Sequence, residues 1–70
     1  MASDDTKTQR EQEDELLIEL CREAGDIGTD EELVEGARAN HDSEDIAEAA
    51  QGDVAALILL RIAFGLPIFV

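Results

Sequence analysis

Hydrophobic positions between residues 9 and 24 recur with the period of an α-helix. The apolar side chains on one side of this stretch are Leu16, Leu17, Leu20, Cys21 and Ala24. Most of the other positions are acidic or polar, which is typical of an amphipathic helix at the surface of a small domain. Glu11, Glu13, Asp14 and Glu15 lie in the first turns and Arg22 lies near the other end, an arrangement that complements the helix dipole. The pattern predicts a helix that begins at Gln9 and stops at Gly25.

A second, shorter helix is indicated after this stop. Thr29 is followed three residues later by Glu32, the spacing of a capping box. The apolar stripe behind it is narrow and consists of Leu33, Val34 and Ala37. Ile27 stands where it could act as a hydrophobic staple at the helix start. The helix is expected to end near Ala39.

The third helical pattern has small apolar side chains. Asp42 or Ser43 is placed to cap it. Its apolar positions are Ile46, Ala47, Ala49 and Ala50. Beyond them two alternatives stay open. Either Gly52 ends this helix and Asp53 caps a new one, or a single helix continues from residue 44 to residue 64.

Residues 54–64 are apolar at every position except Arg61. A helix without a polar face is normally buried on all sides. Gly65 and Pro67 are expected to end it and to leave an extended apolar tip.

The predicted fold is all-α, a small bundle of three to four short helices. It is organised as a flexible polar arm (1–8), an acidic helical body (9–53), and an apolar helix with an extended docking tail (54–70). A chain of 70 residues has a small core, so a partner, a metal or disulfides commonly support it. Cys21 is the only cysteine, which excludes an internal disulfide, and its apolar neighbours favour a buried thiol.

Charge divides the chain in two. The formal net charge is −13, from 18 acidic and five basic residues, and every acid lies in residues 1–53. This lysine-poor, acid-rich composition is typical of proteins from salt-adapted hosts, where salt screens the self-repulsion. Direct nucleic-acid binding is not expected, because phosphates must be neutralised by basic side chains. The polar, acidic N-terminal stretch is unlike a secretion signal. We therefore expect a cytoplasmic or virion location.

No candidate chemistry rises above this background. His41 and Asp42 lie beside other acids, but without the spacing of a calcium loop or a zinc site, and we expect His41 to face solvent. The segment around Ile46 and Gly52 loosely resembles a helix-turn-helix, but its second helix offers no side chain that could hydrogen-bond a base. We expect no catalytic residue, no cofactor, no metal and no small-molecule substrate.

The apolar segment 54–70 must be covered by something. A lipid bilayer is possible as an anchor, yet the segment is at the short limit for a span and carries Arg61 near its middle. The chain's own core accounts for part of the segment. We favour a protein partner, either a larger assembly or another copy, with Arg61 paired to a carboxylate of either chain. The expected partner-binding residues are Val54, Leu57, Ile58, Leu60, Arg61, Phe64, Leu66, Ile68, Phe69 and Val70.

The function expected from these features is that of a non-enzymatic structural or accessory subunit, which docks into a larger protein assembly through its C-terminal segment. The most concrete assembly is a virion of a halophilic host, in which the chain is a minor capsid, connector or tail component. Two alternatives remain: a small membrane-anchored acidic protein, and an acidic regulatory binder such as an antitoxin or a nucleic-acid mimic.

Overall fold

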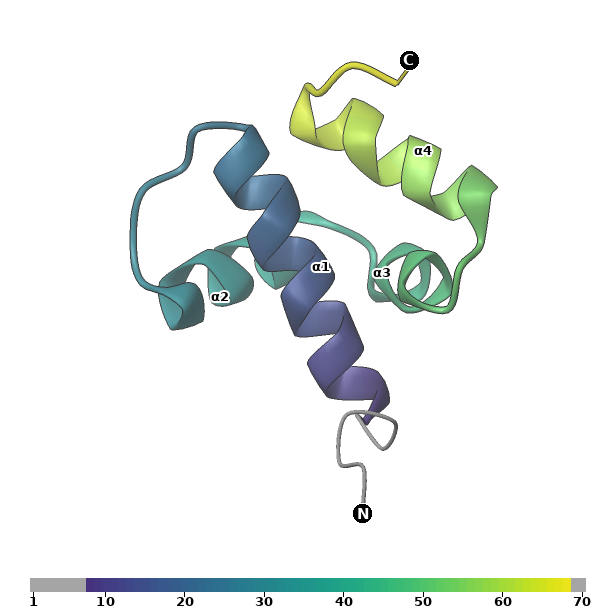
Figure 1. Cartoon of the computed structure of the whole chain (residues 1–70), viewed down its shortest axis with the longest axis horizontal. Helices are drawn as coiled ribbons and strands as arrows, with labels where there is room; N and C mark the ends of the chain where they lie inside the picture. Colours follow the sequence, from purple (N-terminus) through teal and green to yellow (C-terminus); the bar gives the residue numbers. More distant parts are fainter. Residues whose placement is uncertain (1–7, 69–70) are drawn as a thin grey trace.

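The computed structural model describes residues 8–68, and this part of the chain is all-α, as predicted. Four helices follow one another: α1 (Gln9–Glu23), α2 (Asp30–Asn40), α3 (Ser43–Ala50) and α4 (Val54–Phe64). In Figure 1, α1 crosses the centre of the molecule, α2 lies on one side of it, and α3 and α4 lie on the other. The arm predicted for residues 1–8 lies outside the described residues except for Thr8.

Local capping fixes where the first two helices begin. Thr8 caps α1, because its hydroxyl accepts from the Glu11 amide and the Glu11 carboxylate accepts from the Thr8 amide. Thr8 is therefore part of the helix start, which corrects its assignment to the arm. Thr29 and Glu32 form the predicted capping box at α2. These reciprocal bonds satisfy amides that have no partner within the helix.

The staple predicted for Ile27 is wrong. Its side chain is 96% exposed, while Leu33 is buried in the core. A staple needs an apolar residue directly before the N-cap, and Gly28 occupies that position before Thr29. Ile27 is one residue too early to reach Leu33.

Gly52 separates α3 from α4 and resolves the alternative that the sequence left open. Its φ of 103° lies in the left-handed region. The following amide, of Asp53, donates to the carbonyl of Glu48, which is the hydrogen bond of a Schellman motif. The Asp53 carboxylate then accepts from the amides of Ala55 and Ala56 and starts α4. Residues 44–64 therefore form two helices.

Every helix contributes to one core of ten buried residues: Leu17, Leu20, Cys21, Leu33, Val34, Ala37, Ile46, Ala49, Ala56 and Leu60. α1 packs against each of the other three helices, and α3 packs most extensively against α4. The central helix is therefore α1 and not the more apolar α4. The reason is that α1 is the longest helix and presents a continuous buried stripe, whereas α4 buries only Ala56 and Leu60.

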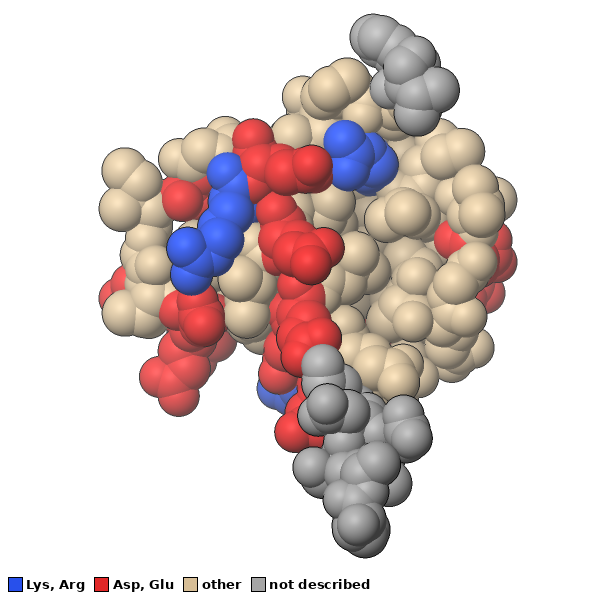
Figure 2. All heavy atoms as spheres, in the orientation of Figure 1, with Lys and Arg blue, Asp and Glu red and all other residues tan. Residues whose placement is uncertain are grey.

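Acidic side chains gather along α1 on the face shown in Figure 2, while the surface over α4 is free of them. The polar side of α1 faces water and its apolar side faces the core. The amphipathic pattern predicted for residues 9–24 is confirmed for Leu16, Leu17, Leu20 and Cys21, whereas Ala24, at the C-cap, is exposed.

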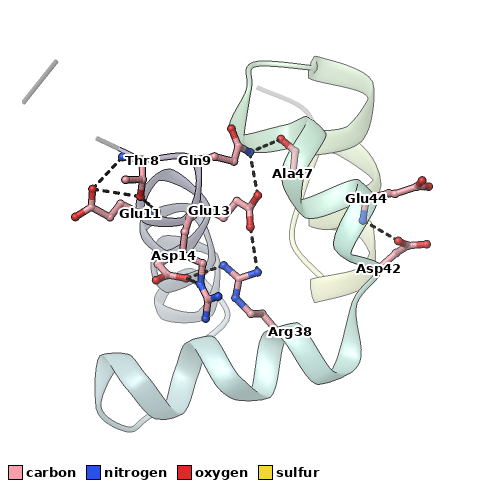
Figure 3. A network of polar contacts seen from close by, with 10 residues as sticks. Thr8, Gln9, Glu11, Glu13, Asp14, Arg38, Asp42, Glu44 and Ala47 are labelled. Carbon is pink, nitrogen blue, oxygen red and sulfur yellow. Dashed lines mark hydrogen bonds and ion pairs between the residues drawn. The ribbon is translucent and has the colours of Figure 1, made fainter. Parts of the chain in front are cut away.

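A half-buried arginine joins α2 to α1. The two terminal nitrogens of Arg38 lie 3.0 Å from Oε1 of Glu13 and 2.7 Å from Oδ1 of Asp14 (Figure 3). The hydrogen bond to Asp14 raises the pKa of Arg38, burial acts against it, and Glu13 adds to the rise. The Gln9 amide extends the network to α3, since it donates to Glu13 and to the Ala47 carbonyl.

We expect Arg38→Gln to lower the free energy of unfolding by about 2 kcal/mol, because it leaves the Glu13 carboxylate without its cation and leaves Asp14 only the longer contact with Arg10. The matched control is Arg10→Gln, which removes an exposed arginine 3.6 Å from Asp14 and should change stability by less than about 0.5 kcal/mol. Urea unfolding followed by circular dichroism at fixed salt measures both. Equal losses for the two variants would contradict the role of Arg38.

Two glycine substitutions should have opposite effects. Gly36 lies inside α2 with open space where a Cβ would be, so Gly36→Ala should raise the free energy of unfolding by about 1 kcal/mol. Gly52 has a positive φ, so Gly52→Ala should lower it by about 1 kcal/mol. Thermal unfolding checks the pair; a stabilised Gly52→Ala variant would show that the α3–α4 turn is not as described.

Candidate functional site

The two sides of α4 have different surroundings. The inner side contributes Ala56 and Leu60 to the core, and Leu57 and Phe64 pack against its edge. The outer side is apolar and exposed to solvent: Val54 67%, Ile58 36%, Leu59 55% and Ile62 55%. Two exposed alanines adjoin these residues: Ala55 on the same side, and Ala63 at the edge, where it also borders a hollow next to α1 and α2. We call these six residues the outer face of α4.

The outer face corrects the expectation that an entirely apolar helix is buried on all sides. The neighbours α1 and α3 cover only part of the circumference of α4. Exposed single leucines are ordinary in proteins, whereas a contiguous apolar surface of this kind marks an interaction site. Ile68, beyond the helix, is also exposed.

No acidic residue occurs between residues 54 and 68, so the outer face has no carboxylate of its own. Arg61 is half-buried and is used within the chain: Nη1 lies 2.8 Å from Oε1 of Glu23 on α1, and Nε donates to the Pro67 carbonyl. The first of the two partners expected for Arg61, a carboxylate of its own chain, is therefore the observed one. The ion pair with Glu23 joins α4 to α1, and the hydrogen bond to Pro67 turns residues 65–68 back over the end of the helix.

The ten residues predicted to bind a partner have different places in the structure. Exposed are Val54, Ile58 and Ile68; half-buried are Leu57, Arg61, Phe64 and Leu66; Leu60 is buried; Phe69 and Val70 lie outside the described residues.

Leu60 requires a correction, because a side chain that is 2% exposed belongs to the chain's own core. Sequence reasoning also missed Leu59 and Ile62. Ile62 could have been found, since it continues the spacing of four residues from Val54 and Ile58. Leu59 lies beside that row.

His41 is also placed differently from the expectation that it faces solvent. Its ring stacks on that of Phe64, with centroids 4.3 Å apart and planes 12° from parallel. The ring is half-buried and links the α2–α3 connection to the end of α4. Among residues 8–68, no three potential metal-ligating side chains come together.

An open hollow of about 660 Å³ lies beside this stack. Its walls include Leu33, Gly36, Ala37 and Ala63, and Cys21 lies at its floor. The Cys21 thiol is buried as predicted, and it donates to the Leu33 carbonyl at 3.7 Å. Burial raises the pKa of this thiol, and the negative charge of Asp26 raises it further. The thiol is therefore protonated at neutral pH and is a poor nucleophile.

We expect Cys21 to react with a disulfide reagent such as DTNB at least about tenfold more slowly in the folded chain than in the urea-unfolded chain at neutral pH. Because its folded pKa is raised, the stability that the neutral thiol contributes is present below about pH 9 and is lost as the pH rises above that value. Equal rates in the two states would show that the thiol is accessible.

None of the helices in the described range is long and apolar enough to cross a bilayer. Comparison with known proteins leaves the outer face of α4 as the main clue to function: no family model, no curated protein and no solved structure matches this chain.

Proposed function

We propose that this chain is a small non-enzymatic accessory subunit that docks into a larger protein assembly through the outer face of α4. One observation carries the proposal. Four large aliphatic side chains are exposed together on a helix that no carboxylate shares. Apolar surface contributes about 25 cal/mol per Å² when it leaves water, so covering the exposed parts of these side chains favours association, against the entropy that binding loses.

The position of the charges supports docking by this face. The acids concentrate on α1 and the other helices of the body, where they keep the free subunit soluble. The apolar surface is separate from them, so a partner can cover α4 without desolvating a carboxylate, which would be costly.

The outer face is also preorganised. The Asp53 cap fixes one end of α4, and Gly65, with a φ of 79°, terminates the other. The Arg61–Glu23 pair holds the helix on α1. A partner therefore meets a helix that is already formed, which reduces the entropy lost on binding.

The assembly that we propose is the particle of a virus with a salt-adapted host. The excess of acids over lysine supports a high-salt environment, where self-repulsion is screened. Small acidic helical subunits without disulfides are common as minor capsid, connector or tail components.

A second candidate function rests on the acidic surface of α1 in place of the apolar face of α4. Glu11, Glu15, Glu19 and Glu23 are exposed and repeat every four residues along α1, although Glu11 also caps the helix and Glu23 also pairs with Arg61. A row of this kind places a carboxylate about every 6 Å, which suits a basic protein surface that normally binds nucleic acid. In this reading the chain is an acidic regulatory binder.

Co-sedimentation with the assembly tests the docking function. A tagged chain is expressed in its cell of origin and particles are separated at native salt. We expect Ile62→Glu to reduce the particle-bound fraction at least about tenfold, because it places a charge in an apolar interface. Ile27→Glu is the matched control: it adds the same charge at an exposed isoleucine outside α4 and should leave binding unchanged.

Glu19→Lys separates the two candidates, since it alters the acidic row and leaves α4 intact. The regulatory binder would be favoured by three results together. Glu19→Lys would abolish binding of the chain to the assembly, Ile62→Glu would retain it, and high salt would weaken it.

A further inference from the structure

The exposed side chains of the outer face of α4 are spaced evenly about Ile58, and this arrangement indicates what covers the face. Resting on the docking role proposed above, we infer that the surface covering it is the same face of a second copy of this chain, packed antiparallel about a twofold axis near Ile58. The partner that the chain meets in the assembly is then another copy of itself, and the contact between copies is the docking contact.

The first argument is the spacing of the exposed side chains. Val54, Ile58 and Ile62 lie four residues apart, so Ile58 is the centre of the row. An antiparallel copy related by a twofold axis at the centre places Ile58 on its equivalent and the smaller Val54 on the larger Ile62. Ala55, beside this row, is small and leaves room for the facing helix.

The second argument is area. The exposed fractions of the outer face and Ile68 amount to roughly 500 Å² per copy, or roughly 1,000 Å² for a pair, at the lower limit of specific interfaces. The face is thus large enough for a dimer of moderate affinity. Its composition is entirely aliphatic, as in the centre of homodimer interfaces.

The third argument is charge, and it selects the antiparallel arrangement. Asp53 is the acid nearest to the row and lies at the start of α4. A parallel pair would bring the two Asp53 carboxylates together. An antiparallel pair separates them by about the length of α4, roughly 16 Å, which exceeds the Debye length at physiological salt.

Net charge gives the dimer a characteristic salt dependence. Each copy carries −13, so two copies repel one another through their acidic bodies. Added salt screens this repulsion and leaves the apolar contact intact or stronger. Association should therefore strengthen with salt, whereas binding of this anionic chain to a basic partner would weaken.

Sedimentation equilibrium of the purified full chain tests the dimer. In about 3 M KCl we expect a monomer–dimer equilibrium with a dissociation constant of about 1–100 µM, weakening at least about tenfold in about 0.2 M KCl. Ile62→Glu should raise the constant at least about 100-fold, and Ile27→Glu, with the same added charge, less than about threefold. Unchanged circular dichroism shows that the variants remain folded.

Cross-linking with a short bis-maleimide tests the arrangement. Ile58→Cys, at the axis, should cross-link to its copy, and Val54→Cys should cross-link to Ile62→Cys in a mixture of the two variants. Efficient self-linking of Val54→Cys alone would overturn the antiparallel geometry. The native Cys21 is buried and serves as the background in the unsubstituted chain.

A monomer at both salt concentrations, or a dimer that Ile62→Glu does not weaken, would overturn the inference. These failures differ from failure of the docking function. A monomeric chain whose Ile62→Glu variant still drops out of the particle would assign the face to a different protein, whereas Ile62→Glu remaining in the particle would remove the docking role itself.

Discussion

The contact of α1 with the other three helices is the constraint on which this fold depends. With only 70 residues, the chain has one small core, and α1 supplies Leu17, Leu20 and Cys21 to its centre. The Arg38 pair with Glu13 and Asp14 locks α2 onto the same helix, and the Arg61–Glu23 pair does so for α4. Both cations therefore serve the packing around α1, although the chain has very few of them.

A core of this size leaves a surplus of apolar surface. α4 is apolar at ten of its eleven positions, but α1 and α3 cover only its inner side. Most of this surplus lies on the outer face of α4, with the acids elsewhere; Ile27 is the exposed aliphatic residue far from it in the sequence. A chain that needed only to fold could place polar residues there at little cost to its core. The aliphatic side chains at these positions are the basis of the docking role proposed above.

In the proposed self-association, salt acts on the charges and on the apolar surface in different ways. The net charge of −13 makes copies repel one another at low salt, and high salt screens this repulsion while it leaves hydrophobic association intact. The proposal therefore gives the acidic body and the apolar face separate roles, solubility for the first and contact for the second. The same charge disfavours nucleic acid as a partner.

The helix positions and the cap at Thr29 were determined by the sequence itself, because a capping box is made by hydrogen bonds within a few residues. Thr8 has the same spacing to Glu11, although it was assigned to the arm, and the stop at Gly52 was one of two alternatives until the structure showed its hydrogen bonds. The side of α4 that is buried was decided only by the tertiary structure. A helix with apolar residues all round has no periodicity to mark its inner face, so the sequence could not separate Leu60, in the core, from Leu59, in solvent. The stacking of His41 on Phe64 likewise required the connection after α2 to meet the end of α4. Local hydrogen bonds can be read from spacing, whereas the choice among equivalent apolar faces depends on which neighbours fold against them.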